Sequence, residues 1–273
     1  LRAKKGLGQH FLVDEGALRS ILDAAQLTEE DTVIEVGPGL GVLTAELAGR
    51  AGRVVAVELD DRLADILKQS LASYQNVTII NRDILGVAPE ALLSEAGLDS
   101  PSAGYKVVAN LPYYITSPVL RHFLEAPVKP ESMVVMVQKE VAAEITAGPG
   151  QMSLLSIGIQ LYGEPSIIDY VPAGSFYPVP EVDSAILRVI PYGRQAIEID
   201  DEAGFFALVR AGFSAARKQL ANSLALGLDV PKEKAVKLLE KAGIEPRRRA
   251  EALSLEEWAR LYRIYRGEEE PKW

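Results

Sequence analysis

The chain of 273 residues contains no cysteine and only two histidines. The absence of cysteine excludes disulfides, thiolate metal sites and a cysteine nucleophile. Because only His10 and His122 could supply imidazole, we also expect no multi-histidine metal site. The first twenty residues mix charged and apolar side chains, unlike a signal peptide or a membrane span. The sequence therefore predicts a cytoplasmic protein that binds neither a metal nor a membrane.

Positive charge is also scarce, because 29 Lys and Arg stand against 38 Asp and Glu, a formal charge of −9. An acidic total ordinarily argues against a nucleic-acid partner, since phosphate groups are bound by Lys and Arg. The chain through Tyr192 has 14 basic and 24 acidic residues, a charge of −10, whereas the remainder has 15 and 14, a charge of +1. A ligand responds to local patches rather than to the sum. The C-terminal part therefore remains a candidate for binding nucleic acid.

Short runs of apolar and β-branched residues alternate with helical patterns through the first two thirds of the chain. The runs cover residues 32–36, 54–58, 77–80, 106–109, 133–137, 167–170 and 185–190. This alternation predicts an α/β fold with a mostly parallel sheet covered on both faces. The last two runs are separated by a proline-containing segment without a long helical pattern, which predicts an antiparallel pair at one edge.

After Pro191 the pattern becomes helical. Three helix starts are marked by capping residues: Asp200 with Asp201, Pro231, and Ser254 with Glu257. We therefore predict an α/β domain of residues 1–193 and a small all-α domain of residues 194–273.

The segment from Val33 to Thr44 is typical of a strand, a glycine turn and a helix. Its glycines, Gly37, Gly39 and Gly41, would let the backbone approach a ligand closely. The third glycine comes one place earlier than in dinucleotide-binding loops, and the nearby Glu35 would repel a pyrophosphate but attract a cation. S-Adenosylmethionine has a sulfonium and an ammonium group and no phosphate, so the loop predicts this cofactor. Another ligand or simple tight packing is the alternative.

Two further acids follow strand ends. Glu58 lies 21 residues after Gly37, where a carboxylate can accept hydrogen bonds from both ribose hydroxyls. Asp83, just after the third strand, is placed to meet the adenine amino group of the cofactor. Each acid alone could be an ordinary strand-end carboxylate. Together with Glu35 they favour a ligand site in the crevice at the sheet edge.

The tetrapeptide Asn110-Leu-Pro-Tyr113 follows an apolar strand and suggests the chemistry. The amino nitrogen of adenine is a poor nucleophile because its lone pair is delocalised, so a methyltransferase has to hold it with hydrogen-bond acceptors. The side-chain oxygen of Asn110 and the carbonyl of Leu111, which precedes the rigid Pro112, can both accept from that group. Tyr113 can stack on the base. The methylated ammonium can lose its proton to water, so no catalytic His or Cys is needed. A helix-start turn is the alternative interpretation.

Five motifs occur in order between residue 4 and about residue 262. They are Gly8-Gln-His-Phe-Leu12, Asn110-Leu-Pro-Tyr-Tyr-Ile-Thr-Ser-Pro118, Gln138-Lys-Glu-Val141, Phe176-Tyr-Pro-Val-Pro-Glu-Val-Asp-Ser184 and Arg217-Lys-x-Leu-x-Asn-Ser-Leu224. This set resembles the KsgA family of small-subunit ribosomal RNA adenine dimethyltransferases. The resemblance implies a Rossmann-like class I methyltransferase domain with a seven-stranded sheet, followed by a small helical RNA-binding domain.

The resemblance also implies a reaction and a set of site residues. The family dimethylates the N6 amino groups of two adjacent adenosines in the hairpin loop near the 3′ end of 16S ribosomal RNA, and S-adenosylmethionine is converted to S-adenosylhomocysteine. By matching motif, Phe176 would clamp the target base opposite Tyr113. The implied cofactor contacts are His10, Leu12, Gly37, Glu58, Asp83 and Asn110. Position 10 is often Asn in this family, so the role and tautomer of His10 stay open.

The basic residues occur in short clusters. The candidates for RNA contact are Lys4, Lys5, Arg217, Lys218, Arg247, Arg248 and Arg249. A solvated charge run is the alternative for each cluster. Their position at the N-terminus and in the helical domain would nevertheless suit an RNA backbone.

Two other functions remain possible. One is methylation of adenine in 23S ribosomal RNA, which confers antibiotic resistance and uses the same glycine loop and tetrapeptide. The other is a ribosome-assembly or nucleic-acid-binding factor in which methylation is secondary. The Phe176 to Ser184 motif favours the small-subunit reaction, with the 30S subunit or its precursor as partner. No oligomer interface is recognisable, so we expect a monomer.

Overall fold

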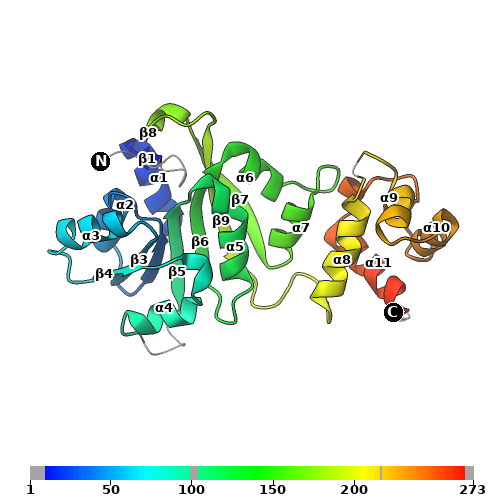
Figure 1. Ribbon diagram of the computed structural model, residues 1–273, viewed down its shortest axis with the longest axis horizontal. Helices are drawn as coiled ribbons and strands as arrows, with labels where there is room; N and C mark the ends of the chain where they lie inside the picture. The colour runs from blue at the N-terminus through cyan, green and yellow to red at the C-terminus, as the bar shows by residue number, and fades with distance from the viewer. Residues whose placement is uncertain (1–9, 99–103, 216, 268–273) are drawn as a thin grey trace. The chain divides into compact units, whose positions relative to one another are not determined.

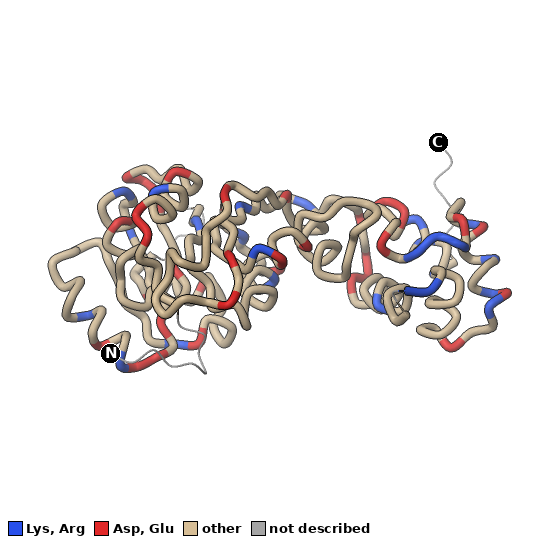
Figure 2. The backbone as a smooth tube through the Cα atoms, turned by 90° about the horizontal axis from the view of Figure 1, so that it is seen from above, with Lys and Arg blue, Asp and Glu red and all other residues tan. Residues whose placement is uncertain are grey.

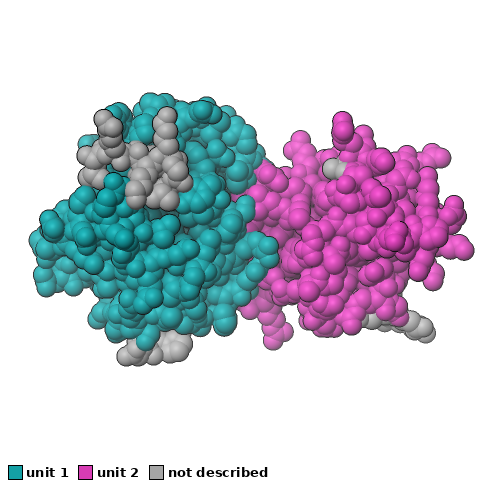
Figure 3. Space-filling view, viewed as in Figure 1, with its two compact units in different colours: residues 1–143, 163–191 teal, residues 144–162, 192–273 magenta. Residues whose placement is uncertain are grey.

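The computed structural model describes residues 10–98, 104–215 and 217–267. The chain forms two compact units, one of residues 1–143 and 163–191 and the other of residues 144–162 and 192–273 (Figure 3). The boundary after Pro191 agrees with the change of pattern at that point. Residues 144–162, however, are not part of unit 1, although a contiguous first domain was predicted to include them. They belong to unit 2 because the hydroxyl of Tyr162 bonds to Glu202 and its carbonyl accepts from the backbone N–H of Tyr192.

Unit 1 is built on a seven-stranded sheet with the order β4-β3-β2-β5-β6-β9-β7 (Figure 1). Its strands are β2 (Thr32–Val36), β3 (Arg53–Glu58), β4 (Val77–Asn81), β5 (Tyr105–Asn110), β6 (Ser132–Gln138), β7 (Gly163–Val171) and β9 (Ser184–Pro191). The pairs from β4 to β6 are parallel, whereas β9 runs antiparallel to both β6 and β7. The predicted parallel sheet with an antiparallel edge is confirmed.

Helices cover both faces of this sheet, as expected for strands that are buried almost throughout. They are α1 (Glu15–Ala25), α2 (Val42–Ala48), α3 (Asp61–Ser70), α4 (Pro89–Glu95), α5 (Thr116–Leu124) and α6 (Lys139–Ile145), with short 3-10 turns η2 (Ile84–Gly86), η3 (Tyr113–Ile115) and η4 (Ala173–Ser175). On one face Ile21 and Leu22 of α1 pack in a core with Leu47 of α2. On the other, Phe123 of α5 meets Tyr105 of β5.

A two-stranded ribbon lies beside the main sheet. Its strands, β1 (Phe11–Leu12) and β8 (Phe176–Tyr177), pair antiparallel, with Phe11 opposite Tyr177 and Leu12 opposite Phe176. Directly opposite residues point to the same face of such a ribbon. Leu12 and Phe176 therefore share one face, which is part of the core of unit 1.

Unit 2 is helical. Its helices are α7 (Leu154–Gln160), α8 (Glu202–Phe213), α9 (Leu220–Gly227), α10 (Lys232–Lys241) and α11 (Leu255–Arg266), with the 3-10 turn η5 (Ala250–Ala252). Asp201 caps α8, Pro231 precedes α10, and Ser254 and Glu257 form the capping box of α11, as the sequence predicts. Trp258 is fully buried and stacks on Phe213. No helix within the described residues has the length and apolar character needed to cross a membrane.

Candidate active site

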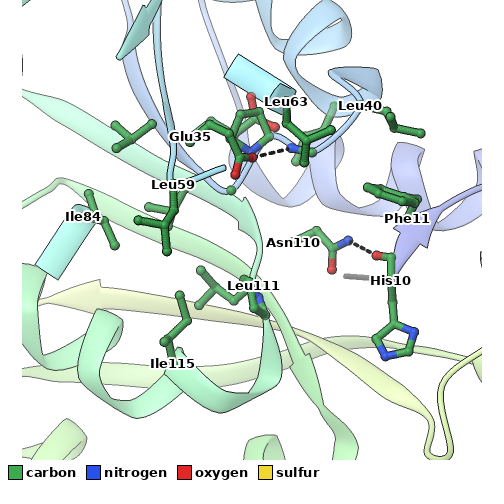
Figure 4. A pocket seen from close by; sticks show the side chains of 18 of the residues that line it. His10, Phe11, Glu35, Leu40, Leu59, Leu63, Ile84, Asn110, Leu111 and Ile115 are labelled. Atoms are coloured by element: carbon green, nitrogen blue, oxygen red, sulfur yellow. Dashed lines mark hydrogen bonds between the residues drawn. The ribbon is translucent and has the colours of Figure 1, made fainter. Parts of the chain in front are cut away.

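A cavity of about 350 Å³ lies where the strands β2, β3, β4 and β5 reach their carboxyl ends. Figure 4 shows Glu35, Leu59 and Ile84 on one side and His10 with Phe11 on the other. Open parallel sheets bind ligands at this edge, and the volume suits a small organic molecule. The order of the strands in the sheet thus brings together residues up to 105 positions apart in the sequence, from His10 to Ile115.

The glycine turn between β2 and α2 forms part of the wall. Gly37 and Gly39 have φ of 67° and 61°, a region that favours glycine, and both line the cavity. Gly41, predicted to bind the cofactor, has φ of 82° but is not among the lining residues. A Cβ there would come within 2.8 Å of Leu67, so the third glycine allows α2 to pack closely on α3.

Glu35 lines the cavity from β2 although its side chain is only 1% exposed. Burial, together with the charge of Glu58, raises the pKa of its carboxyl to about 8. Its Oε2 has no hydrogen-bond partner among the described residues. A buried carboxyl with an unused oxygen beside a cavity is a suitable partner for a cationic group.

Glu58 ends β3 and is also buried. Its Oε2 accepts from the backbone N–H of Gly39 at 3.2 Å and its Oε1 from that of Asp60 at 2.9 Å. Burial nevertheless raises the pKa of this carboxyl above its ordinary value. A carboxylate has about four acceptor positions, so its bonds with the backbone of Gly39, Asp60 and Leu59 do not use all of them. This arrangement suits a pair of ligand hydroxyls.

Asp83 and Leu12 lie far apart in the sequence, and both line the cavity. Asp83 is exposed and uses Oδ1 to cap the short turn η2, by accepting from Leu85 N–H at 3.0 Å. Leu12 is buried in the ribbon strand β1. The structure therefore brings together all the predicted cofactor contacts except Gly41, including His10 and Asn110.

The tetrapeptide from Asn110 to Tyr113 follows β5 directly, and all four residues line the cavity. Leu111 is fixed by its backbone N–H, which donates to Met136 of β6 at 3.2 Å. Nδ2 of Asn110 donates to the backbone carbonyl of His10 at 3.1 Å. Because a carbonyl can only accept, the amide oxygen of Asn110 is turned away from His10 (Figure 4).

Tyr113 is held at two places. Its hydroxyl bonds to Ser184 Oγ at 2.8 Å, and its ring stacks on that of His10 with 5.8 Å between centroids and 21° between planes. Burial raises the pKa of the phenol. The sequence pattern indicated Tyr113 as an aromatic platform, but neither of these two supporting contacts could be recognised from spacing.

Phe176 is the expected second aromatic residue of the base clamp. Its side chain is 2% exposed, belongs to the core of unit 1 and does not line the cavity. The register of the ribbon pairs Phe176 with Leu12, which belongs to the same core and also lines the cavity. The role of Phe176 opposite Tyr113 across a bound base stays a prediction.

Several apolar lining residues were not predicted. Leu59 and Ile84 directly follow the acids Glu58 and Asp83, and Leu40 lies inside the glycine turn. The signal that could have found them is their position at the ends of parallel strands, where consecutive residues share the crevice.

The basic residues predicted to contact RNA fall into different classes. Arg217, Lys218 and Arg247 are exposed in turns between the helices of unit 2. Figure 2 shows basic and acidic segments interspersed in the part of the chain that leads to the C-terminus. Arg248 instead binds both carboxylate oxygens of Glu257 and the carbonyl of Ala252. Arg249 lies 3.5 Å from Glu251.

The remaining predicted residues, Lys4 and Lys5, lie outside the described part of the chain. Within the described part, no group of three or more His, Asp or Glu side chains is arranged to hold a metal ion.

The doubly wound sheet, the acid and glycine turn after β2 and the Asn-Leu-Pro-Tyr segment after β5 together define a class I methyltransferase that modifies ribosomal RNA. The chain belongs to the ribosomal RNA adenine dimethylase family, whose model matches residues 1–266.

Relatives and solved structures agree with this assignment. Ribosomal RNA small subunit methyltransferase A of Dehalococcoides mccartyi is 56% identical over 98% of this chain and 90% of its own, and that of Bacillus mycoides is 45% identical over 94% and 89%. Among solved structures, the 23S rRNA methyltransferase ErmE has a TM-score of 0.70 at 30% identity, over 93% of this chain and 98% of its own. A dimethyladenosine transferase from Plasmodium falciparum has a TM-score of 0.75 at 26% identity, over 92% and 96%.

Proposed function

We propose that this protein uses S-adenosylmethionine to dimethylate the N6 amino groups of two adjacent adenosines in the 3′-terminal hairpin loop of 16S ribosomal RNA during small-subunit biogenesis. The observation that carries the proposal is the amide of Asn110. Its nitrogen is engaged by the carbonyl of His10, so its oxygen is left to accept a hydrogen bond at the cavity.

The cavity fits the proposed cofactor. The buried, partly unsatisfied carboxyl of Glu35 suits a cationic group, and the carboxylate of Glu58 in the cavity wall suits the ribose hydroxyls. Gly37 and Gly39 leave the wall free of Cβ atoms, and Asp83 stands at the rim with one oxygen not used by its turn. When bound, S-adenosylmethionine supplies an electrophilic methyl group.

The residues after β5 would position the other reactant. Asn110 Oδ1 and the Leu111 carbonyl accept from the adenine amino group and orient its lone pair, while Tyr113 stacks on the ring. The amino nitrogen would gain a methyl group, which leaves S-adenosylhomocysteine, and would then lose a proton to water. No side-chain base is required, because the ammonium formed on adenine is far more acidic than an ordinary amine.

Two arguments support a hairpin-loop adenosine of the small-subunit ribosomal RNA as the substrate. The relatives named small subunit methyltransferase A are 56% and 45% identical to this chain, whereas the 23S rRNA methyltransferase is 30% identical. In addition, a base in a hairpin loop is easier to unstack than one in a duplex, where the cost is a few kcal/mol, and stacking on an aromatic side chain returns about 1–3 kcal/mol.

The RNA would be held outside the cavity by exposed basic residues of unit 2, among them Arg217, Lys218 and Arg247. Lys4 and Lys5 remain candidates from the N-terminal segment. We propose action in the cytoplasm as a monomer, on the 30S subunit or its precursor.

The test is transfer of labelled methyl groups to undermethylated 30S subunits, with 50S subunits and free 23S RNA as competing substrates. We expect label on the small subunit only, and loss of nearly all activity in Asn110→Ala. The matched control is Gln75→Ala, which also removes an amide but from an exposed position away from the cavity. Label on 23S RNA alone would refute the substrate, and activity retained by Asn110→Ala would refute the mechanism.

A further inference from the structure

The hydroxyl groups of Tyr113 and Ser184 bond to each other at the edge of the sheet where the cavity lies. Their oxygens are 2.8 Å apart, and either oxygen can be the donor. Ser184 is completely buried, whereas Tyr113 is partly buried and lines the cavity. A buried hydroxyl without a partner is costly. Each of these two groups therefore favours the position in which the other can bond to it.

Ser184 is held in the sheet from both sides. It is the first residue of β9, where it pairs with Gln138 of β6 and with Val171 of β7. The carbonyl of the preceding Asp183 accepts from the backbone N–H of Lys139 at 3.0 Å. Tyr113 lies instead in the short turn η3, after the end of β5. The hydrogen bond thus ties a side chain on a turn to a strand inside the sheet.

The segment that precedes Ser184 contains Phe176, the second aromatic residue predicted at the target base. Asp183 closes this segment, because its Oδ1 accepts from the backbone N–H of Ala173 at 3.0 Å. Within the segment, Ser175 Oγ donates to Asp14 Oδ2 at 2.9 Å. Since Ser184 follows Asp183 directly, its bond joins Tyr113 to the segment that contains Phe176.

The direction of the Tyr113 ring matters for the proposed reaction. A base stacked on this ring takes its plane from the ring, and that plane sets the direction of the N6 lone pair. With its hydroxyl bonded to Ser184, the ring is held at the end farthest from the backbone. Without that bond the side chain is free to turn about χ1 and χ2, and a stacked base would turn with it.

We propose that Ser184 is a positioning residue for the methylation of adenine, which acts through Tyr113 by fixing the ring on which the target base stacks. Ser184 is not among the described residues that line the cavity, so it acts without contact to either reactant. The inference rests on the proposed function, since it assigns Ser184 to the adenine side of that reaction.

The test compares Ser184→Ala, Tyr113→Phe and the double variant. The two single variants remove the same hydrogen bond from its two sides, and Tyr113→Phe keeps an aromatic ring for stacking. Methyl transfer to undermethylated 30S subunits is measured in single turnovers at increasing subunit concentration. We expect each single variant to lower the maximum rate by roughly 5- to 10-fold, the effect of one net hydrogen bond, and the double variant to be no slower. The half-saturating subunit concentration should stay the same, because the proposed RNA contacts of the described residues lie in unit 2.

The matched control is Ser156→Ala. Ser156 is also a completely buried serine, and its hydroxyl bonds to the backbone of Ser153, but it lies in α7 of unit 2. This variant should lose stability without losing rate, which separates positioning from a general loss of stability. Cofactor affinity, measured by calorimetry with S-adenosylhomocysteine, should be unchanged in all four variants.

Three results would overturn the proposal. One is a wild-type rate in Ser184→Ala. Another is a double variant whose loss is the product of the two single losses, since the two hydroxyls would then act independently. The third is a fall in cofactor affinity that matches the fall in rate, which would place the effect in the cofactor site.

A structural readout separates this inference from the proposed function. Carbon NMR of protein labelled at tyrosine Cζ reports on each phenol, and Tyr113→Phe identifies the signal of Tyr113. We expect Ser184→Ala to shift this signal because the phenol loses its partner, whereas an unshifted signal would refute the contact. If the wild-type protein fails to methylate 30S subunits, the proposed function is wrong, and the NMR result still decides whether Ser184 holds Tyr113.

Discussion

The carboxyl group of Glu35 combines deep burial with an unused oxygen in the wall of a cavity. Ionising it in the free protein is unfavourable because little water reaches it and Glu58 adds negative charge, so its pKa is raised to about 8. An approaching cation would reverse that balance. In the free protein near neutral pH the group is therefore mostly protonated.

This environment predicts a pH dependence of stability. Between the ordinary pKa of 4.5 and about 8, the folded protein keeps a proton on Glu35 that the unfolded chain has released. The free energy of unfolding therefore falls as pH rises through this range, by at most about 1.4 kcal/mol per pH unit from this group. Glu35→Gln cannot titrate, so urea unfolding from pH 5 to 8 should show a flatter slope.

The control for this experiment is Glu30→Gln, because Glu30 is an exposed side chain of the same unit. It should leave the slope as in the wild-type protein. Equal slopes for Glu35→Gln and the wild-type protein would show that the Glu35 carboxyl is ionised in the folded state.

At the scale of elements, the three glycines in the turn between β2 and α2 have different structural roles. Gly37 and Gly39 face the cavity, whereas Gly41 is the N-cap of α2 and faces Leu67 and Leu71 of the α3 region. The sequence pattern alone does not distinguish the three glycines. Their separate roles follow from the packing of α2 against α3, which cannot be recognised from the sequence of the turn.

We predict that Gly41→Ala destabilises unit 1 by about 2–4 kcal/mol, the sum of a left-handed backbone penalty and overpacking. Gly97→Ala is the matched control, since Gly97 also has positive φ, 77°, but a Cβ there meets no described atom within 4 Å. It should cost only about 1–2 kcal/mol. Thermal and urea unfolding would measure both, and equal losses would exclude the contact with Leu67.

The elements also show where sequence patterns are weak. The helix α9 was not predicted, because its N-cap Gln219 makes no side-chain capping bond and its residues lack a clear start signal. Strand β7 begins at Gly163, four residues before the predicted run, and includes Pro165. As an edge strand it tolerates proline, so its true start depends on pairing with β9 rather than on local composition.

For the molecule as a whole, unit 1 has 14 basic and 23 acidic residues and unit 2 has 15 of each, but individual basic residues differ in availability. Arg248 is paired with Glu257, which also closes the capping box of α11. The neighbouring Arg247 is exposed. A run of three arginines therefore includes one that stabilises unit 2 and others that remain at its surface.

Replacing Arg247 or Arg248 should have different effects, one on RNA binding and the other on stability. Arg247→Ala should weaken binding to ribosomal RNA and lower the slope of log affinity against log salt by about one, with unchanged stability. Arg248→Ala should lower the stability of unit 2 by about 2 kcal/mol, because it leaves Glu257 without its charged hydrogen bonds. Binding at several salt concentrations and thermal unfolding distinguish them. A salt slope that is the same in Arg247→Ala as in the wild-type protein would remove Arg247 from the RNA-binding residues.

Sequence patterns alone were sufficient for the class of fold, the seven strands, three helix starts and the segments that line the cavity, because periodicity, capping and motif spacing are local properties. Tertiary structure decided the rest. It placed residues 144–162 in unit 2, turned Phe176 into the core and paired Arg248 with Glu257. It also brought His10 against Asn110 and Tyr113. Each of these depends on register or on contacts between distant segments, which no local pattern records.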